Sequence, residues 1–260
     1  MSLLAPCGQK GAHIVSSASR IPLTKPFTPR TLKNLRDALN TPEAYGGYQH
    51  PRNAAVLIPF CNVNNEPSVL FELRSKALRS HSGEVSFPGG RVDNTDASFI
   101  QAALRETDEE LGISPSTIEV LGQIGPPEMD MRGKLRVWPI VGFLHANGLD
   151  PGFDEDTFLP SLDMDAVRSQ ASKDEVGTVF HLPLSMLVAP ARLKPTLFRG
   201  ARPYWSIDVT DIVSRYCDLD LDPNSGSVDE VGSGVGGKVE VWGLTGWYLS
   251  LMLKQLRIHH

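Results

Sequence analysis

Three glutamates near the middle of the sequence, Glu106, Glu109 and Glu110, have a spacing that indicates a chemistry. Residues three and four positions apart project from one face of a helix, within about 5–6 Å of each other at Cβ. Carboxylates packed this closely repel one another, and a hard divalent cation such as Mg²⁺ or Mn²⁺ removes the repulsion because it prefers oxygen ligands. An isolated cluster of this kind is more often a solvated helix face, but here Arg105 and a Gly-Gly turn precede it. The combination favours a metal site.

The residues around the glutamates must form the helix that positions them. Apolar residues recur at roughly 3.6-residue spacing between positions 99 and 111, and Gly112 follows where a left-handed residue can end a helix. Before the helix, residues 88–90 read Pro-Gly-Gly, a tight turn that brings backbone carbonyls close to the glutamates. The carbonyl of Gly90 is therefore a further candidate metal ligand.

This arrangement resembles the Nudix box, in which Gly, five residues, Glu and seven residues precede Arg-Glu-apolar-x-Glu-Glu-x-Gly-apolar. Residues 105–113, RETDEELGI, match the second half. The first half departs from the pattern, because the expected Glu falls on Ala97, beside Asp96, and one extra residue lies in the loop. In the family that Glu commonly pairs with the box Arg, and the sequence leaves open whether Arg105 pairs with Asp96, Asp93 or another group.

The resemblance implies an α/β fold, the Nudix α/β/α sandwich with a mixed β-sheet between helices. It also implies that Glu106, Glu109, Glu110 and the Gly90 carbonyl hold Mg²⁺ or Mn²⁺ as cofactor. Arg105 is expected to orient the helix and its carboxylates. Carboxylates that bind metal stay ionised, so the attacking water needs a base with a free lone pair. Glu109 and Glu175 are both candidates, Glu175 because EVGTVFHLPL resembles the Glu-Val…Phe…Pro-Leu element of the family.

The segment before the box, residues 74–90, carries several cationic donors suited to an anionic substrate. LRSHSGEVSFPGGRVD resembles the signature of the coenzyme A diphosphatase branch of the Nudix family, in which the extra loop residue is usual. That resemblance implies hydrolysis of coenzyme A and its acyl derivatives to 3′,5′-ADP and (acyl-)4′-phosphopantetheine. The substrate-binding residues it implies are Arg74, Arg79, His81, Gly83, Glu84 and Phe87.

Two other functions compete with this interpretation. The same metal chemistry would serve a pyrophosphatase acting on oxidised nucleotides such as 8-oxo-dGTP, and the segment before the box favours coenzyme A over it. A non-catalytic binding module on a Nudix scaffold is the third possibility. Such modules typically lose box glutamates, and all three are present here.

Composition limits the partners. The chain has 260 residues, 41% of them hydrophobic, and a net charge of −5, which argues against a protein that coats nucleic acid. No apolar run approaches the roughly 20 residues needed to span a bilayer. Three widely spaced cysteines fit a reducing compartment and no zinc site. We expect a small-molecule substrate, coenzyme A or a nucleoside diphosphate derivative, with neither nucleic acid nor membrane as partner, and a homodimer stays open.

We expect residues 1–30 to form a flexible N-terminal arm, because they contain Ser, Pro and basic residues but no acid. The arm also resembles an organelle transit peptide. An intracellular location is expected, with peroxisome or mitochondrion suspected and cytosol open. Residues 31–260 are predicted to form one Nudix domain, with insertions at about 150–173 and 218–238.

Within that domain the hydrophobic pattern predicts a hairpin of strands over residues 54–60 and 68–74. A short helix over residues 31–39 is predicted, with Thr31 as its N-cap. The chain is predicted to close with a strand fragment and an apolar helix, in which WGLTGWYL also resembles the coenzyme A diphosphatase branch.

Overall fold

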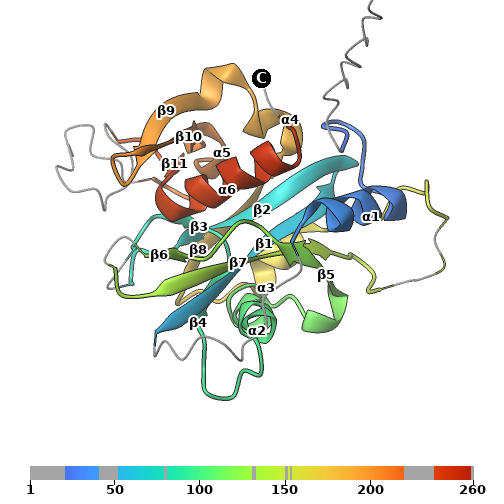
Figure 1. Ribbon diagram of the computed structural model, residues 1–260, viewed down its shortest axis with the longest axis horizontal. Helices are drawn as coiled ribbons and strands as arrows, with labels where there is room; N and C mark the ends of the chain where they lie inside the picture. The colour runs from blue at the N-terminus through green and yellow to red at the C-terminus, as the bar shows by residue number, and fades with distance from the viewer. Residues whose placement is uncertain are drawn as a thin grey trace, which may run out of the picture.

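The computed structural model describes residues 21–40, 52–78, 81–130, 133–149, 152, 154–219 and 237–258 (Figure 1). The helices of these residues are α1 (Pro29–Ala38), α2 (Phe99–Leu111), α3 (Met164–Gln170), α4 (Leu184–Leu187), α5 (Thr210–Val213) and α6 (Gly243–Gln255), with short 3-10 turns at Pro115–Thr117 and Pro190–Arg192. The strands are β1 (Asn53–Val63), β2 (Glu66–Arg74), β3 (Val85–Ser86), β4 (Gly89–Arg91), β5 (Ile118–Gln123), β6 (Glu128–Met129), β7 (Arg136–Leu144), β8 (Val176–Pro183), β9 (Leu193–Phe198), β10 (Arg202–Asp208) and β11 (Glu240–Val241).

A mixed sheet forms the centre of the molecule, in the order β3-β2-β1-β7-β5, with β4 paired to β1, β6 to β7 and β8 to β2. Strands β1 and β7 run parallel, whereas the other pairs are antiparallel. The predicted hairpin is confirmed as β1 and β2. It turns at Asn64 and Asn65, whose φ angles of 51° and 60° suit the tight turns that match strand twist.

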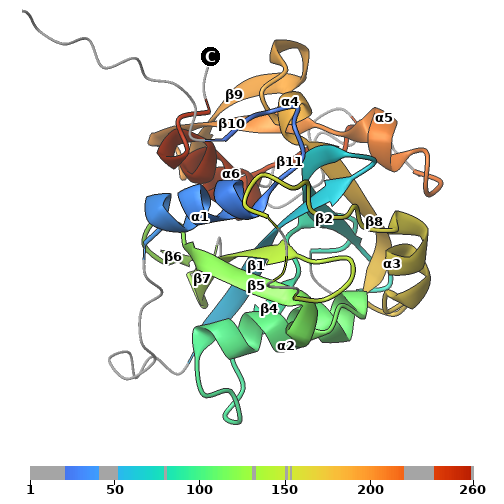
Figure 2. The same cartoon turned by 90° about the vertical axis from the view of Figure 1, so that its right-hand side faces the viewer.

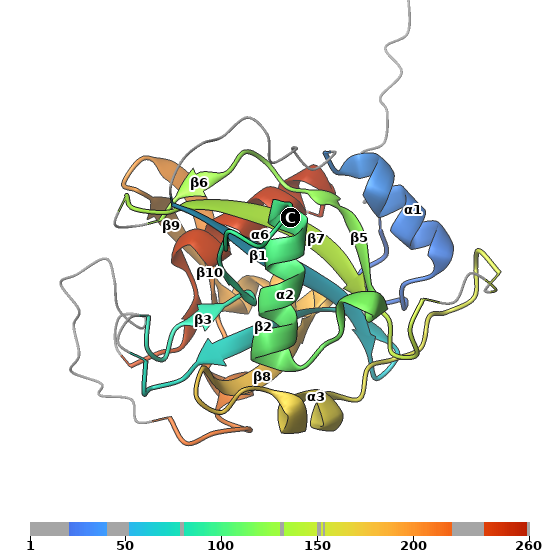
Figure 3. The ribbon, with the colours of Figure 1, turned by 90° about the horizontal axis from the view of Figure 1, so that it is seen from below.

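Helices α2 and α3 cover one face of this sheet (Figures 2 and 3). Phe99 at the start of α2 stacks on Trp138 of β7, with ring centroids 4.0 Å apart. Ala102 and Ala103 of α2 are fully buried. Their small side chains allow α2 to lie close to the strands, and its carboxylates reach Gly89 and Gly90 of β4.

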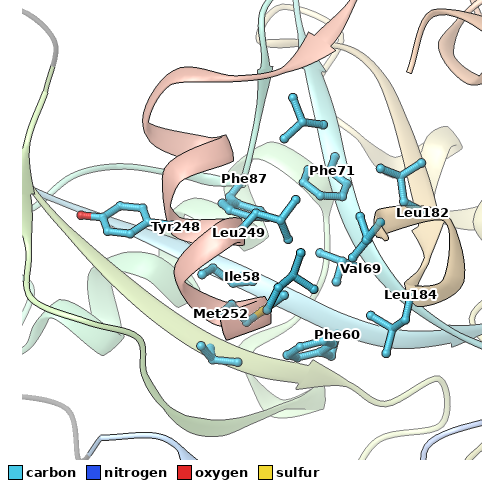
Figure 4. Packing of buried hydrophobic residues seen from close by; sticks show 14 of the residues in the cluster. Ile58, Phe60, Val69, Phe71, Phe87, Leu182, Leu184, Tyr248, Leu249 and Met252 are labelled. Atoms are coloured by element: carbon cyan, nitrogen blue, oxygen red, sulfur yellow. The ribbon is translucent and has the colours of Figure 1, made fainter. Parts of the chain in front are cut away.

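The other face is covered by α1 and α6, and by a second antiparallel sheet in the order β11-β10-β9 (Figure 1). Figure 4 shows Leu249 and Met252 of α6 packed over the side chains of β1 and β2, whereas Tyr248 points away from them. The Tyr248 hydroxyl donates a hydrogen bond to the Val137 carbonyl (2.7 Å) and accepts one from the backbone N–H of Glu128 (2.9 Å). The predicted mixed sheet between helices is thus confirmed, and the predicted C-terminal strand fragment and helix are β11 and α6. The pairing of β11, β10 and β9 into a second sheet is an addition to the prediction.

The N-terminal part of the described chain differs from the prediction. Helix α1 begins at Pro29 and is capped by Thr28, not by Thr31, because Thr31 occupies the third helical position and bonds back to Thr28. Ile21 and Phe27 are buried in the core. Residues 21–30 therefore pack with the domain instead of forming an arm. The predicted arm and transit peptide otherwise fall on residues 1–20, outside the described residues.

The segment predicted as an insertion at about 150–173 also packs into the domain where it is described. Leu159 is buried, and its carbonyl accepts a hydrogen bond from Asn62 Nδ2 (2.8 Å). Helix α3, capped by Asp163, buries Met164 and Val167 against the α2 face. Most of the second predicted insertion, 218–238, lies outside the described residues. Among the helices of the described ranges, none is both long and apolar enough to cross a membrane.

Candidate functional site

Helix α2 holds the three box glutamates, as predicted. The Ser98 side chain accepts a hydrogen bond from the Gln101 N–H at its start, and Gly112 ends it in the left-handed conformation with φ 66°. Thr107, which stands where the box pattern has an apolar residue, is fully buried and donates its hydroxyl hydrogen to the Ala103 carbonyl (2.7 Å). The polar substitution therefore leaves the helix intact.

Two of the glutamates contact the Gly-Gly turn. Glu110 is 4% exposed, and its Oε2 accepts a hydrogen bond from the backbone N–H of Gly89 at 2.7 Å. The Glu106 carboxylate lies directly against Gly90, because a Cβ added there would stand 2.5 Å from Glu106 Cδ. A larger residue at this position would require the Glu106 carboxylate to move. The structure thus brings together Glu106, Glu110 and Gly90, three of the four predicted metal ligands.

Glu109 and Arg105 lie at the solvent side of the same helix. The Glu109 side chain is 54% exposed, and its Oε2 is 2.9 Å from Arg105 Nη1. Arg105 also binds Asp96 through two hydrogen bonds of 3.0 and 3.1 Å and donates to the Arg91 carbonyl (3.0 Å). Asp96 is buried, and the bond from Arg105 lowers the pKa of its carboxyl. Asp96 therefore takes the place of the Glu missing from the box, which answers the question that the sequence left open.

A fourth carboxylate, Glu72 of β2, belongs to the same cluster. It was not identified as a candidate site residue from the sequence. Its side chain is fully buried. Oε1 accepts a hydrogen bond from the Ser86 hydroxyl (2.8 Å) and a longer one from Arg74 Nη1 (3.4 Å). The available signal was a single charged residue within the apolar strand VLFEL.

Arg74 makes contacts that the sequence did not indicate, and its predicted substrate role stays a prediction. Its Nη1 lies 3.4 Å from Glu72 Oε1 and 3.5 Å from Glu110 Oε1, so the guanidinium bridges two buried carboxylates. Most of its side chain is covered, with 22% exposed. Arg74 also lines the cavity described below, and its charge is shared by two buried carboxylates.

Burial and mutual repulsion dominate the electrostatics of the cluster. Burial raises the pKa values of Glu72, Glu106 and Glu110, and each is raised further by neighbouring carboxylates. Glu175, an exposed residue just before β8, is one of those neighbours, because its charge acts on both Glu72 and Glu106. Its carbonyl accepts a hydrogen bond from the Ser75 N–H (2.8 Å), which fixes its position. The structure therefore places Glu175 beside the box helix.

The cluster fits a divalent cation by its chemistry. Its donors are hard carboxylate oxygens, the type preferred by Mg²⁺ and Mn²⁺, and one of them, Glu72 Oε2, is buried without a hydrogen-bond partner in the described part of the chain. Within the same described residues, no three His, Cys, Asp or Glu side chains converge on one point with the geometry of a bound ion. The ligand roles of Glu106, Glu109, Glu110 and Gly90 therefore stay a prediction.

A cavity of about 270 Å³ opens beside the Gly-Gly turn. Residues of the segment before the box line one side of it, and the start of α6 lines the other. The lining includes Arg74, His81, Glu84, Phe87, Gly90, Arg91, Trp242, Gly243, Leu244 and Thr245. The α6 residues are the second part of the site that the residue types did not reveal, although WGLTGWYL had been singled out by resemblance.

The predicted substrate-binding residues divide between the cavity wall and its support. His81 Nδ1 lies 2.9 Å from Glu84 Oε2, and both line the cavity. Phe87 lines it too, but is 3% exposed and stacks on Phe71, so it is mainly a core residue. Gly83 forms the turn behind, with φ 69° and its N–H donating to the Arg74 carbonyl (3.1 Å). Arg79 lies outside the described residues.

Comparison with known proteins places this site in a family. The NUDIX domain matches residues 51–157. The uncharacterized Nudix hydrolase NudL of Citrobacter koseri is 38% identical over 160 residues, which cover 62% of this chain and 72% of the relative. The protein of the same name from Escherichia coli (strain SMS-3-5) is 42% identical over 144 residues, which cover 55% and 64%. The chain thus spans between 64% and 72% of the length of these relatives.

Solved structures resemble the chain more distantly. The NUDIX domain of Shewanella oneidensis NrtR, complexed with ADP ribose, is 19% identical with a TM-score of 0.34, over 54% of this chain and 80% of that one. A C. elegans Ap4A hydrolase is 20% identical with a TM-score of 0.36, over 52% and 81%. Likenesses with TM-scores this low support no conclusion about this chain.

Proposed function

The chain belongs to the Nudix hydrolase family, and from this premise we propose that it hydrolyses the diphosphate of coenzyme A and its acyl derivatives with Mg²⁺ or Mn²⁺ as cofactor. The products would be 3′,5′-ADP and 4′-phosphopantetheine, or its acyl form. Hydrolysis of a phosphorus anhydride is the part that family membership supports, and the coenzyme A substrate is the finer proposal.

One observation carries the proposal. The cavity beside the box is walled by both segments that resemble the coenzyme A diphosphatase branch, the one before the box and the start of α6. These segments are more than 150 residues apart in the sequence, between His81 and Trp242. Their meeting at one cavity next to Gly90 supports a common role in holding the substrate.

The residues of the chain would divide the work as follows. Glu106, Glu110 and the Gly90 carbonyl would hold the cation, which when bound neutralises the diphosphate and acidifies a water molecule. Arg105 keeps α2 and the loop before it in register through Asp96 and the Arg91 carbonyl. Arg91 is exposed and lines the cavity, where its guanidinium would bind a phosphate group of the substrate.

The proton of the attacking water needs an acceptor, and two carboxylates are placed for it. Glu109 is the most exposed glutamate of the cluster and holds one contact with Arg105. Glu175 is exposed, and its charge acts on Glu106. An exposed carboxylate keeps a lone pair free to accept a proton. We propose one of these two as the general base.

The test is to incubate the purified protein with coenzyme A and Mg²⁺ or Mn²⁺, with 8-oxo-dGTP in a parallel reaction, and to separate the products by ion-pair chromatography. Glu106→Gln serves as the control for contaminating hydrolases. We expect 3′,5′-ADP from the wild type and little 8-oxo-dGMP. If 8-oxo-dGMP is the main product, the proposed coenzyme A substrate is wrong, whereas metal-dependent hydrolysis of a phosphorus anhydride stands. No reaction in either tube would favour a non-catalytic binding module.

A further inference from the structure

We infer that Glu72 is an additional carboxylate of the metal centre, contributed by the central sheet and lying outside the box. The inference rests on the proposed metal-dependent function and extends its site from α2 and the Gly-Gly turn to strand β2. Its ligand atom would be Oε2, and the cation would be the Mg²⁺ or Mn²⁺ that the box glutamates hold.

The first support is the state of the Glu72 side chain. It is fully buried, and its two oxygens differ: Oε1 accepts hydrogen bonds from Ser86 and Arg74, whereas Oε2 has no hydrogen-bond partner in the residues described. A buried polar atom left without a partner destabilises the fold, and more so when it is charged. A bound cation would supply the missing partner, since buried charges are paired or coordinate metals.

The second support is the place of Glu72. Its register partner across the ladder is Ser86, three residues before Gly89, the residue whose N–H binds Glu110. Arg74 Nη1 lies within 3.5 Å of an oxygen of both Glu72 and Glu110, so the two carboxylates face the same side of one guanidinium. Glu72 therefore points into the cluster formed by α2 and the turn.

The third support is the balance of charge. The groups that face Glu72 are Arg74 from its own strand, Ser86 from β3, Glu110 from α2 and Glu175 from the turn before β8. Arg74 is the cation among them, and it is shared by two carboxylates at distances longer than a strong ion pair. This excess of negative charge in a buried place suits a divalent ion.

The competing interpretation is a structural one, in which Glu72 stays protonated and only packs the strand against Ser86. The two interpretations differ in what a glutamine would do. Glu72→Gln keeps the shape and the bond from Ser86. It removes a negative charge from a crowded cluster if Glu72 is ionised, and it replaces one neutral group by another if Glu72 is protonated. The metal-free protein should therefore melt at the same temperature as the wild type or higher, under either interpretation.

Metal binding separates the two. We would titrate metal-free wild type, Glu72→Gln and the control Glu66→Gln with Mn²⁺ by calorimetry, and measure melting with and without Mn²⁺. Glu66 lies on the same strand but is exposed. We expect Glu72→Gln to bind Mn²⁺ about tenfold to hundredfold more weakly, judged by what loss of a supporting group costs metal sites, and to lose most of the Mn²⁺-induced rise in Tm. Glu66→Gln should match the wild type.

Each outcome bears on one claim. Wild-type protein that binds no Mn²⁺ would refute the proposed function itself. Wild type and Glu72→Gln binding Mn²⁺ equally would overturn the inference and leave the function standing. If Glu72→Gln does not fold, Glu72→Asp replaces it, because the charge is kept and the oxygens are withdrawn by one methylene. Affinity equal to wild type in folded Glu72→Asp would also overturn the inference.

Discussion

The two faces of the central sheet are built on different principles. Besides its own apolar contacts, the α2 face carries a short run of sequence with specific polar pairs, such as Glu110 with Gly89 and Arg105 with Asp96. The α6 face is made of apolar side chains from distant segments, including Phe87, Leu249 and Met252 (Figure 4). In the proposed function the first face performs the chemistry, and the second contributes to the cavity wall and to the stability of the fold.

The sharpest way to break this comparison is at the α2 face, with Glu109→Gln. The change keeps the shape and removes a charge, and general base catalysis is worth about 10²–10⁴ in rate. We expect turnover to fall by a factor in that range, whether the carboxylate binds metal or accepts the proton. The Tm should change little because the side chain is 54% exposed. Turnover near the wild-type level would remove Glu109 from the chemistry and leave Glu175 as the candidate base.

The matching change on the α6 face is Met252→Ala, which should act on stability alone. Met252 is fully buried between α6 and the sheet, and truncation of such a residue costs about 2–5 kcal/mol. Denaturant unfolding should show this loss, while turnover per folded molecule stays at the wild-type value. A large fall in turnover at full folding would show that the apolar face takes part in the chemistry.

Tyr204→Phe tests the cavity wall at the start of α6. The Tyr204 hydroxyl of β10 accepts a hydrogen bond from the Gly243 N–H at the start of α6 (2.9 Å). Its loss is worth about 1 kcal/mol, and it loosens the wall formed by residues 242–245. We expect KM for the substrate to rise several-fold while kcat is kept. Steady-state kinetics would check this, and a fall in kcat alone would place the wall in the chemical step.

The smallest effect concerns pH and the metal-free protein. Burial raises the pKa values of Glu72 and Glu110 above the ordinary 4.5. An acid whose pKa is higher in the folded state favours folding while it keeps its proton, and this advantage is lost as pH rises through the folded pKa. Without metal, Tm should therefore fall by a few degrees between about pH 6 and about pH 8.5. Mn²⁺ should cancel the fall, and a metal-free Tm that rises over this interval would contradict the electrostatics described.

Local patterns predicted the α2 face well. The period of the apolar residues located α2, and its left-handed end at Gly112 followed from the residue type. Glu72 escaped because a lone glutamate in an alternating strand suggests a solvent-facing side, whereas here both faces of the strand are covered. Substrate binding by Arg74 was predicted from its residue type and its position before the box. The contacts of its guanidinium with Glu72 and Glu110 appear only in the structure.

The second sheet and the cavity wall depend on contacts that no local pattern encodes. Strand β9 is exposed along much of its length and contains Pro195, so it lacks the buried alternation by which strands are found. Residues 242–245 follow directly after β11, which pairs with β10. Both strands are distant from the box in the sequence, so the position of residues 242–245 at the cavity depends on this long-range pairing. The packing of Ile21 and Phe27 likewise depends on partners elsewhere, such as Asn62, whose Oδ1 accepts from the Phe27 N–H (2.8 Å).

The loop between the Gly-Gly turn and α2 is anchored at both ends. Gly89 is held by Glu110, and Asp96 is held by Arg105. In the loop between them, Asp93 to Thr95 are exposed and do not line the cavity. The length of this loop is consequently free to change without moving the carboxylates, which accounts for the extra residue here. It also makes Asn94 a suitable attachment point for a fluorescent dye, one that would sit a few residues from the reaction centre and leave it undisturbed.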